Sequence, residues 1–401
     1  MDIPDCAIPP FFRKSKAFSI FFYTVLAAPL LGFFIAFLLL PKGVFSEEEN
    51  RPLSGIPSFR METLLDGSYT ERLSNYVRDH IPLRGVLLKT KSATELALLK
   101  GENNGVIFGK NGYLIKRFSY SDEQLTVFQS NTAAIFSLCD HLSLGSHPSV
   151  FLCAPRAIDV LLSTESPLAP TIPEERSVWH ILSENAPNAI TMTRELSQRA
   201  AMGEQVWFQT DHHWTALGAY YAYQQLGEHL GYLPLPRTTF LETTVSQDFY
   251  GTSYSAALFP LTRADDVIVF RYAKDGQFIV TDGQTGQSRE GFYEESALDG
   301  KDHYSYFLGG NTAHLTIVKD PQKPRPTLLV IKDSYANALI PFLARHFDIE
   351  MLDLRYMRGD ATEAVQRIVS GDNYYGALIL YNADTLTGNA GLGTIDLDKL
   401  Q

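Results

Sequence analysis

The segment Thr327-Leu-Leu-Val-Ile-Lys-Asp-Ser-Tyr-Ala-Asn-Ala338 is a short apolar run followed by a polar turn and the start of a helix. A continuous apolar run of this length is typical of a strand that is buried on both faces of a parallel sheet. We therefore expect a strand over Thr327–Ile331. The following elements are expected after it: a helix over Ala336–His346, a strand over Ile349–Leu352, a helix over Ala361–Ser370 and a strand over Ala377–Tyr381. This alternation predicts an α/β fold with a parallel sheet flanked by helices.

The preceding part of the chain shows a similar, less regular alternation. We expect helices over Met61–Tyr76, Leu83–Leu99, Glu123–His141, Pro173–Asn185 and Thr193–Ala201, and a strand over Val150–Ala154. Within Gly105–Ile115, the Asn111-Gly112 pair predicts a hairpin turn between two short strands. From about Leu241 to Lys319 the helical period is lost and Tyr, Thr, Gly and Asp predominate, which indicates an irregular β insertion.

One stretch near the N-terminus differs from the rest in hydrophobicity. Ala17–Leu40 contains 24 residues without a formal charge. A helix of that length spans about 36 Å, more than the roughly 30 Å hydrocarbon core of a membrane. A cleaved signal peptide is the alternative, but the apolar run is longer than an ordinary signal sequence and no A-x-A site follows it. We therefore expect a retained transmembrane helix.

The charges around this stretch predict its orientation. Basic residues precede it and acidic residues follow it, at Arg13, Lys14, Lys16 and Glu47–Glu49. Positive charge favours the cytoplasmic side of a membrane. We therefore expect a cytoplasmic tail over 1–16, a transmembrane helix over 17–40, a stalk over 41–57 and an extracytoplasmic domain over 58–401.

Charge and cysteine content exclude several classes of protein. The 401 residues carry a net charge of −11, and residues 45–401 carry −13 because four basic and two acidic residues precede them. Such a surface repels nucleic acid. Only Cys139 and Cys153 fall in the expected exported part, and they are interpreted as buried thiols, with a single bridge as the alternative. Zinc-type C-x-x-C or HExxH spacing is absent, and no cofactor is implied.

Candidate reactive groups occur in the segment Val206–Ala219, in which we expect an apolar strand, the cluster Asp211-His212-His213-Trp214 and then a helix. The Asp211 carboxylate can accept a hydrogen bond from the His213 imidazole and so select its tautomer. If the backbone is extended here, these two side chains share one side and His212 faces away. The alternative is that Asp211 only caps the following helix.

Ser334 is the second candidate, because it follows a buried strand at the expected start of a helix. Unpaired backbone N–H groups and the helix dipole would stabilise an oxyanion that develops beside it. An ordinary N-cap is the alternative for this serine.

Taken together, three motifs resemble those of the bacterial DHHW protein family, which is similar to the SGNH-hydrolase-like alginate O-acetylation proteins. They are the Asp211–Trp214 cluster, the Lys332-Asp-Ser-Tyr335 turn and Glu49-Asn-Arg-Pro-Leu53. The resemblance runs over nearly all of residues 45–401. It implies an SGNH-like fold with a permuted motif order, because Asp211 precedes Ser334 by 123 residues. The chain departs from the usual SGNH pattern in having Lys332 where glycine is usual and an Asp-His spacing that is one residue shorter.

The resemblance also implies a catalytic triad in which Asp211 orients, His213 is the general base and Ser334 is the nucleophile. His212 is the alternative base. Further residues are expected to form the oxyanion hole or to contact substrate: Gly310, Asn311, Tyr335, Tyr254 and Trp214. A Gly-Gly-Asn turn and core packing are the structural alternatives for Gly310–Asn311 and for Trp214.

The function implied is a membrane-anchored extracytoplasmic carbohydrate O-acetyltransferase or acetylesterase that forms an acetyl-serine intermediate. Its expected partners are a cell-surface or exported polysaccharide and a multi-span membrane acyltransferase that supplies acetyl groups. Two alternatives remain at this point. One is a metal-dependent DHH phosphoesterase, which would need further aspartates placed to hold two cations, and we find no convincing D-x-D cluster to accompany Asp211–His213. The other is a catalytically inactive SGNH-like glycan-binding or scaffold protein of the cell envelope.

Overall fold

A computed structural model describes residues 16–143, 147–161 and 177–400, and these divide between two compact units, residues 1–91 and 92–401. The predicted cytoplasmic tail lies almost wholly outside the described residues, as does the start of the helix expected over Pro173–Asn185. The predicted division of the chain at residues 57 and 58 stays a prediction.

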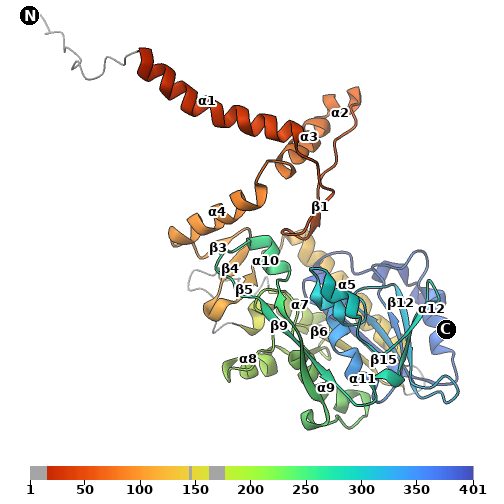
Figure 1. Ribbon diagram of the computed structural model, residues 1–401. Helices are drawn as coiled ribbons and strands as arrows, with labels where there is room; N and C mark the ends of the chain where they lie inside the picture. Colours follow the sequence, from red (N-terminus) through yellow and green to blue (C-terminus); the bar gives the residue numbers. More distant parts are fainter. Residues whose placement is uncertain (1–15, 144–146, 162–176, 401) are drawn as a thin grey trace, which may run out of the picture. The chain divides into compact units, whose positions relative to one another are not determined.

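The first unit begins with the long helix α1 (Lys16–Leu39), coloured red in Figure 1. Its stretch Ile20–Leu39 is long and apolar enough to cross a membrane, with a mean hydropathy of 2.2. The unit also contains the strands β1 (Phe45–Ser46) and β2 (Arg51–Pro52), which pair antiparallel, and the helices α2 (Met61–Leu65), α3 (Ser68–Asp79) and the start of α4 (Arg84–Ala97).

The helix expected over Met61–Tyr76 is in fact two helices. Gly67 adopts a left-handed conformation (φ 81°) between α2 and α3, and Asp66 accepts a hydrogen bond from the Ser68 N–H at 2.8 Å. Both features end one helix and start the next. Around this break, Arg51 pairs with Asp79 at 2.6 Å and Arg84 with Glu49 at 2.7 Å. These ion pairs connect the segment after α1 to the helices of the first unit.

The second unit is built around an eight-stranded mixed sheet in the order β11-β10-β12-β14-β13-β15-β6-β7. Five neighbouring strands, from β14 to β7, are parallel, and β12, β10 and β11 extend the sheet by antiparallel pairing. The strand bounds are β6 Ser149–Ala154, β7 Ile190–Thr191, β10 Ile279–Asp282, β11 Ser288–Glu290, β12 His314–Val318, β13 Thr327–Lys332, β14 Asp348–Leu352 and β15 Tyr374–Asn382. The predicted α/β fold is confirmed, and the sheet that was expected to be parallel is mostly rather than wholly parallel, because three of its strands pair antiparallel.

Helices cover both faces of this sheet, as the apolar strands predicted. Along β13, Leu328 and Val330 point into one hydrophobic cluster, whereas Leu329 and Ile331 point into the other. The helices are α5 Asp122–Leu142, α6 Ala157–Val160, α7 Val178–Asn185, α8 Thr193–Ala201, α9 Ala216–Leu230, α10 Thr252–Ala257, α11 Ile340–Leu343 and α12 Thr362–Val369. Residues of α9 and α11 belong to the first cluster and residues of α5, α7 and α12 to the second. Successive side chains of a strand alternate between its faces, so a strand buried on both faces must be apolar throughout.

Smaller β structures accompany the main sheet. The expected hairpin is present as β4 (Val106–Phe108) and β5 (Leu114–Lys116), and β3 (Glu102–Asn103) adds a third strand. Within the expected β insertion, β8 (Leu241–Phe249) and β9 (Asp265–Arg271) form a separate antiparallel ribbon. The remaining strands of the insertion join the main sheet.

Two local expectations are wrong. The segment Val206–Gln209 is not a strand: it forms a single bridge, from Trp207 to Trp214, and the chain then turns sharply. The helix expected over Ala336–His346 is only a 3₁₀ turn (Ser334–Ala338) followed by the four-residue α11. Pro341 lacks an N–H group and its ring opposes the carbonyl four residues earlier, so it disfavours a continuous helix through Asn337.

Leu378→Ala tests the energetic importance of the sheet core. Leu378 lies in the middle of β15 and is fully buried, so its truncation should lower the free energy of unfolding by about 2–5 kcal/mol. Leu233→Ala, at a leucine that is 87% exposed, should change it by less than about 0.5 kcal/mol. Urea unfolding of both variants makes the comparison. Equal effects would contradict the assignment of β15 to the core.

Candidate active site

Ser334 begins the tight turn that follows β13, at the carboxyl ends of the parallel strands. The preceding Asp333 is fully buried, and its carboxylate accepts hydrogen bonds from the N–H groups of Tyr335 at 3.0 Å and Asn382 at 2.7 Å, and from the Thr385 hydroxyl at 2.7 Å. These bonds fasten the serine turn to the end of the neighbouring strand β15. Ser334 itself is partly exposed, whereas its immediate neighbours are buried.

The turn Asp211–Trp214 is held by two buried tryptophans. The Trp207 indole donates to the His212 carbonyl at 3.0 Å, and the Trp214 indole donates to the Tyr335 carbonyl at 2.9 Å. The second bond crosses from this turn to the serine turn. Trp214 is completely buried, so core packing is its role and the expectation that it contacts sugar is wrong.

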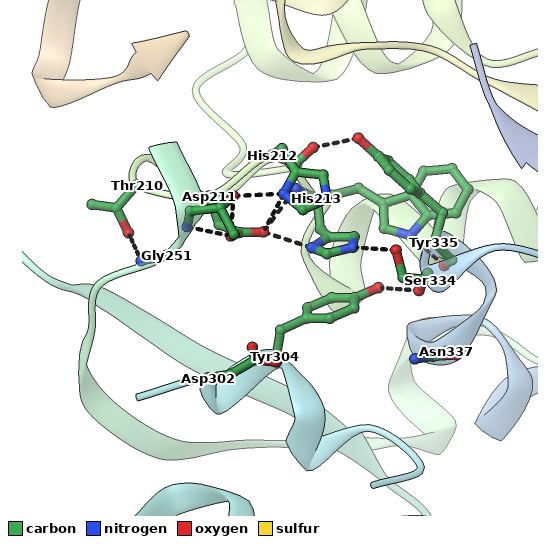
Figure 2. A network of polar contacts seen from close by, with 12 residues as sticks. Thr210, Asp211, His212, His213, Gly251, Asp302, Tyr304, Ser334, Tyr335 and Asn337 are labelled. Carbon is green, nitrogen blue, oxygen red and sulfur yellow. Dashed lines mark hydrogen bonds and ion pairs between the residues drawn. The ribbon is translucent and has the colours of Figure 1, made fainter. Parts of the chain in front are cut away.

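These two turns bring Asp211, His213 and Ser334 together (Figure 2). His213 Nδ1 lies 2.6 Å from Asp211 Oδ1, and His213 Nε2 lies 2.7 Å from Ser334 Oγ. A carboxylate only accepts hydrogen bonds, so Nδ1 carries the proton and Nε2 is the nitrogen that can accept the Ser334 proton. This is the arrangement of a nucleophile, a base and a group that orients the base.

The Asp211 carboxylate is also bound by residues that the sequence analysis missed. Its Oδ2 accepts from the Thr252 N–H at 2.8 Å and from the Thr252 hydroxyl at 2.9 Å. Gly251 permits this approach, because a Cβ added there would lie 2.3 Å from the Asp211 Cβ. The Tyr-Gly-Thr sequence at 250–252 is a turn signal, but nothing local to it indicates contact with Asp211.

A second buried aspartate supports the same turn from β9. Asp265 accepts from the Gln209 N–H at 2.8 Å, the Thr210 N–H at 2.7 Å and the Thr210 hydroxyl at 2.6 Å. Burial, together with the nearby Asp211 charge, raises the pKa of Asp265 to about 6 despite these hydrogen bonds. Through its hydrogen bonds to Gln209 and Thr210, Asp265 fixes the backbone immediately before Asp211.

His212 does not face away from Asp211, contrary to our expectation from an extended backbone. Its Nδ1 lies 2.6 Å from the Thr252 hydroxyl and 3.6 Å from Asp211 Oδ1, and its ring centroid is 3.8 Å from that of His213. The backbone turns between the two histidines, so the alternation of an extended chain does not apply. His212 is the more exposed of the two.

Tyr304 contacts both the base and the nucleophile, and the sequence analysis did not identify it. Its ring stacks on the His213 ring with centroids 3.7 Å apart, and its hydroxyl donates to the Ser334 carbonyl at 3.0 Å. In Figure 2 the Tyr304 ring lies alongside His213, with its hydroxyl directed at Ser334.

The remaining expected site residues have different surroundings. Asn311 Oδ1 accepts from Lys332 Nζ at 2.9 Å, and the Gly310 carbonyl accepts from the Asn337 amide at 3.2 Å, so this loop is bonded to the serine turn. Lys332, Asn337 and the carboxylate of Asp353, 3.5 Å from Lys332 Nζ, form the buried polar centre of this contact.

Tyr335 does not present an open aromatic face at the triad, whereas Tyr254 is only partly buried. Tyr335 is buried, and its hydroxyl donates to the His212 carbonyl. Tyr254 packs against Tyr250, with ring centroids 4.5 Å apart, beside the small core that contains Phe259. Tyr335 therefore stabilises the Asp211–Trp214 turn through a hydrogen bond to its backbone. A substrate role for Tyr254 stays a prediction.

Electrostatic interactions favour a neutral His213. Burial, followed by the charge of His212, lowers the pKa of His213 despite the opposing effect of Asp211. Burial also lowers the pKa of His212, but Asp211 outweighs it and the net shift is upward. Burial raises the pKa of Asp211, yet the two histidines hold it well below its usual range. At neutral pH the site therefore holds a carboxylate and a neutral base.

The same three side chains are the described residues that lie close enough to share a metal ion. The candidate ligand atoms of Asp211, His212 and His213 all lie within 4.8 Å of one another. A carboxylate and two imidazoles are a donor set that Zn²⁺ accepts. An ion bound by His213 Nδ1 would replace its hydrogen bond to Asp211, so metal binding and the triad arrangement compete for the same atoms.

Comparison with known proteins identifies the family. The model of the DHHW protein family matches residues 150–352, which is half of the chain. The chain belongs to the DHHW protein family. The matched region contains Asp211, His213 and Ser334, and the resemblance inferred from the three motifs is confirmed.

Solved structures are similar to this chain, and those with TM-scores above 0.5 share its fold. A DHHW family protein from Eubacterium siraeum is 22% identical over 73% of this chain and 96% of its own, with a TM-score of 0.54. PatB1 from Bacillus cereus, with a sulfonyl adduct, is 19% identical over 73% of this chain and 98% of its own, with a TM-score of 0.57. The O-acetyltransferase domain of Pseudomonas putida AlgJ is 17% identical over 74% of this chain and 98% of its own, with a TM-score of 0.45. No curated protein matches the chain.

His212→Gln tests the electrostatic coupling between the histidines. If Ser334 is the nucleophile and His213 its base, reaction of Ser334 with a sulfonyl fluoride needs neutral His213, so the rate should be high above the pKa of His213 and fall as the pH drops through it. Removing the His212 charge raises that pKa. The acidic limb of the rate–pH profile should therefore move upward, by on the order of one pH unit.

The control for this measurement is His180→Gln, at an exposed histidine of α7, which should leave the profile unchanged. An acidic limb that stays in place in His212→Gln would show that His212 does not tune His213.

Proposed function

We propose that this protein is a membrane-anchored, extracytoplasmic carbohydrate O-acetyltransferase or acetylesterase that works through an acetyl-Ser334 intermediate. The observation that carries the proposal is the unbroken hydrogen-bonded chain from Asp211 through His213 to Ser334. A neutral serine is a weak nucleophile, and an adjacent oriented base is the usual means of activating it. The proposal assigns the three residues these roles.

In the first half-reaction, Ser334 Oγ attacks the carbonyl carbon of an acetyl ester while its proton moves to His213 Nε2. The resulting tetrahedral intermediate carries the negative charge on the former carbonyl oxygen. Collapse of the intermediate breaks the bond to the donor's oxygen, which leaves with the proton from His213. The products are acetyl-Ser334 and the deacetylated donor alcohol.

In the second half-reaction, a sugar hydroxyl or water gives its proton to His213 Nε2 and attacks the acetyl carbonyl. Ser334 Oγ then leaves and recovers the proton. A sugar acceptor makes the protein a transferase, whereas water makes it an esterase. The same three residues serve both reactions, so the acceptor decides between them.

We assign stabilisation of the oxyanion to the serine turn and the loop bonded to it. The Ser334 N–H starts the 3₁₀ turn, where backbone donors are not used by a preceding turn of helix. The Asn311 amide is the second donor we assign. Lys332 is a donor only, so it holds Asn311 Oδ1 at 2.9 Å and leaves the amide nitrogen of Asn311 for other acceptors.

Similarity to a solved structure supports this chemistry. PatB1, which shares the fold, has been solved with a sulfonyl adduct. A sulfonyl adduct forms when an activated nucleophile attacks the reagent. The first half-reaction requires an activated nucleophile of the same kind. The resemblance to alginate O-acetylation proteins supports a cell-surface or exported polysaccharide as the acceptor.

The apolar helix α1 supports a location at the membrane, with residues 1–16 in the cytoplasm, 17–40 across the bilayer, 41–57 as a stalk and 58–401 outside. Acetyl-CoA is a cytoplasmic donor, so an enzyme outside the membrane needs acetyl groups to be passed across it. A multi-span membrane acyltransferase is the partner we propose for this step.

The scaffold interpretation is less well supported. A glycan-binding module has no need for a base within hydrogen-bonding distance of a partly exposed serine, nor for a buried carboxylate that orients that base. All three groups are present with this geometry.

Trapping the intermediate tests the proposed chemistry. With 4-nitrophenyl acetate and no sugar acceptor, mass spectrometry should find an acetyl group on the peptide that contains Ser334. Ser334→Ala, His213→Ala and Asp211→Asn should each lower turnover by roughly 10³-fold or more, and the losses should not add when combined. Ser183→Ala, at an exposed serine of α7, should be neutral. Unchanged turnover in folded Ser334→Ala would overturn the mechanism.

Protease accessibility tests the proposed topology. In spheroplasts, added protease should digest the domain that follows α1 and spare a tag placed before Asp2, because the basic residues before α1 favour the cytoplasm. After detergent has dissolved the membrane, the protease should digest both the domain and the tag. A protected C-terminal domain would contradict the extracytoplasmic location.

A further inference from the structure

Tyr304 makes a near-parallel aromatic contact with His213. Their ring centroids are 3.7 Å apart and their planes differ by 5°. Other aromatic contacts of His213 are less aligned: the His212 ring is tilted by 39° and the Tyr335 ring by 53°. Tyr304 therefore presents its face to the full area of the imidazole.

The hydroxyl of Tyr304 contacts the backbone of Ser334, the proposed nucleophile. It donates to the Ser334 carbonyl at 3.0 Å, and burial raises the pKa of Tyr304 well above its usual value. The phenol therefore stays protonated, and stays a hydrogen-bond donor, at neutral pH. One side chain therefore contacts the base through its ring and the backbone of the nucleophile through its hydroxyl.

The segment that carries Tyr304 is itself fixed. Tyr304 lies in the 3₁₀ turn His303–Tyr306, and the preceding His303 is bonded through Nδ1 to the Ser246 hydroxyl at 2.8 Å and through Nε2 to the Gly300 carbonyl at 3.0 Å. Phe208 packs edge-on against the Tyr304 ring, with ring centroids 6.2 Å apart. Rotation of the ring away from His213 would disturb its contact with Phe208 and the hydrogen bond of its hydroxyl to the Ser334 carbonyl.

We propose that Tyr304 is a positioning residue of the reaction, whose ring face stabilises the imidazolium that His213 becomes when it takes the Ser334 proton. This inference rests on the proposed function, because it requires proton transfer from Ser334 to His213. It assigns Tyr304 a role that depends on the electrons of its ring as well as on its volume.

The physical argument is that the contact strengthens during the reaction. The face of an aromatic ring is negative, and it attracts a cation more strongly than a neutral ring. Before the reaction His213 is neutral, and in the transition state it acquires positive charge. An interaction that is stronger in the transition state than in the ground state lowers the barrier, and so raises kcat and leaves KM unchanged.

The hydroxyl contributes separately. Its hydrogen bond to the Ser334 carbonyl restrains the backbone that carries Oγ, which keeps Oγ near His213 Nε2 in both the free and the acylated enzyme. This part of the role is geometric, and Tyr304→Phe removes it without removing the ring face.

Ring fluorination tests the electronic part. In full-length protein, Tyr304→Phe should retain kcat within about threefold, which is the effect of one neutral hydrogen bond. Phenylalanines that carry one, two or three fluorines, incorporated at position 304, keep the ring's shape but weaken the negative charge of its face. Turnover of 4-nitrophenyl acetate should fall progressively along this series, by about 10-fold in total, with KM unchanged.

Tyr304→Leu removes the face altogether and should lower kcat by at least as much as the most fluorinated ring. Tyr293→Leu is the matched control, because Tyr293 also stacks on an aromatic ring, that of Tyr306, and donates to a backbone carbonyl, that of Phe270. Titration of active sites with a sulfonyl fluoride corrects each kcat for unfolded protein. The control should lose stability without loss of kcat per active site.

The outcomes separate this inference from the proposed function. Absence of acetyl-Ser334 in the wild type would overturn the proposed function, and the Tyr304 inference with it. Acetylation and normal turnover in the wild type, with a kcat that does not depend on fluorination, would overturn only the role of the Tyr304 ring. The fluorinated series decides this even if Tyr304→Leu does not fold.

Discussion

A buried carboxylate has to receive hydrogen bonds on both oxygens, and this requirement on Asp211 governs the site. One oxygen is occupied by the backbone and ring of His213 and the other by the backbone and hydroxyl of Thr252. An unsatisfied charge at this depth would cost several kcal/mol. Avoiding that cost requires three features: the orientation of His213, the tight turn after Asp211 and the absence of a side chain at Gly251.

The same solution is used twice more around the site. Asp265 binds the backbone before Asp211, and Asp333 binds the backbone after Ser334 and the end of β15. Each aspartate replaces the hydrogen bonds that a regular helix or strand would have supplied to the chain at a sharp turn. The two turns can therefore leave regular structure while remaining rigid, which a site that depends on a 2.7 Å contact requires.

The sheet explains how residues so far apart in sequence meet. Ser334 follows β13, at the carboxyl edge where parallel strands commonly place reactive groups. The turn that carries Asp211 and His213 reaches this edge through the Trp214–Tyr335 hydrogen bond. A catalytic triad is defined by its geometry, so the order of the proposed Asp, His and Ser along the chain need not follow the order that is usual in SGNH hydrolases. The buried Lys332, in the place of the usual glycine, bonds the Asn311 loop to the same edge.

The sequence by itself determined the features that depend on local pattern. The apolar strands, their alternation with helices, the hairpin at Asn111-Gly112 and the apolar helix near the N-terminus all follow from periodicity and turn residues. The choice of Asp211, His213 and Ser334 as candidates followed from residue chemistry together with family resemblance. Each of these signals lies within a few residues of the feature that it predicts.

Only the tertiary structure decided which side chains meet. Nothing near Thr252, Asp265 or Tyr304 indicates that they contact Asp211, Thr210 or His213, because the partners lie on other elements tens of residues away. The orientation of His212 and the burial of Trp214 were decided in the same way, by a turn whose backbone is bent by hydrogen bonds to distant groups. Local pattern specifies strands and helices because their hydrogen bonds are local, whereas the site is made of contacts that exist only after the sheet has assembled.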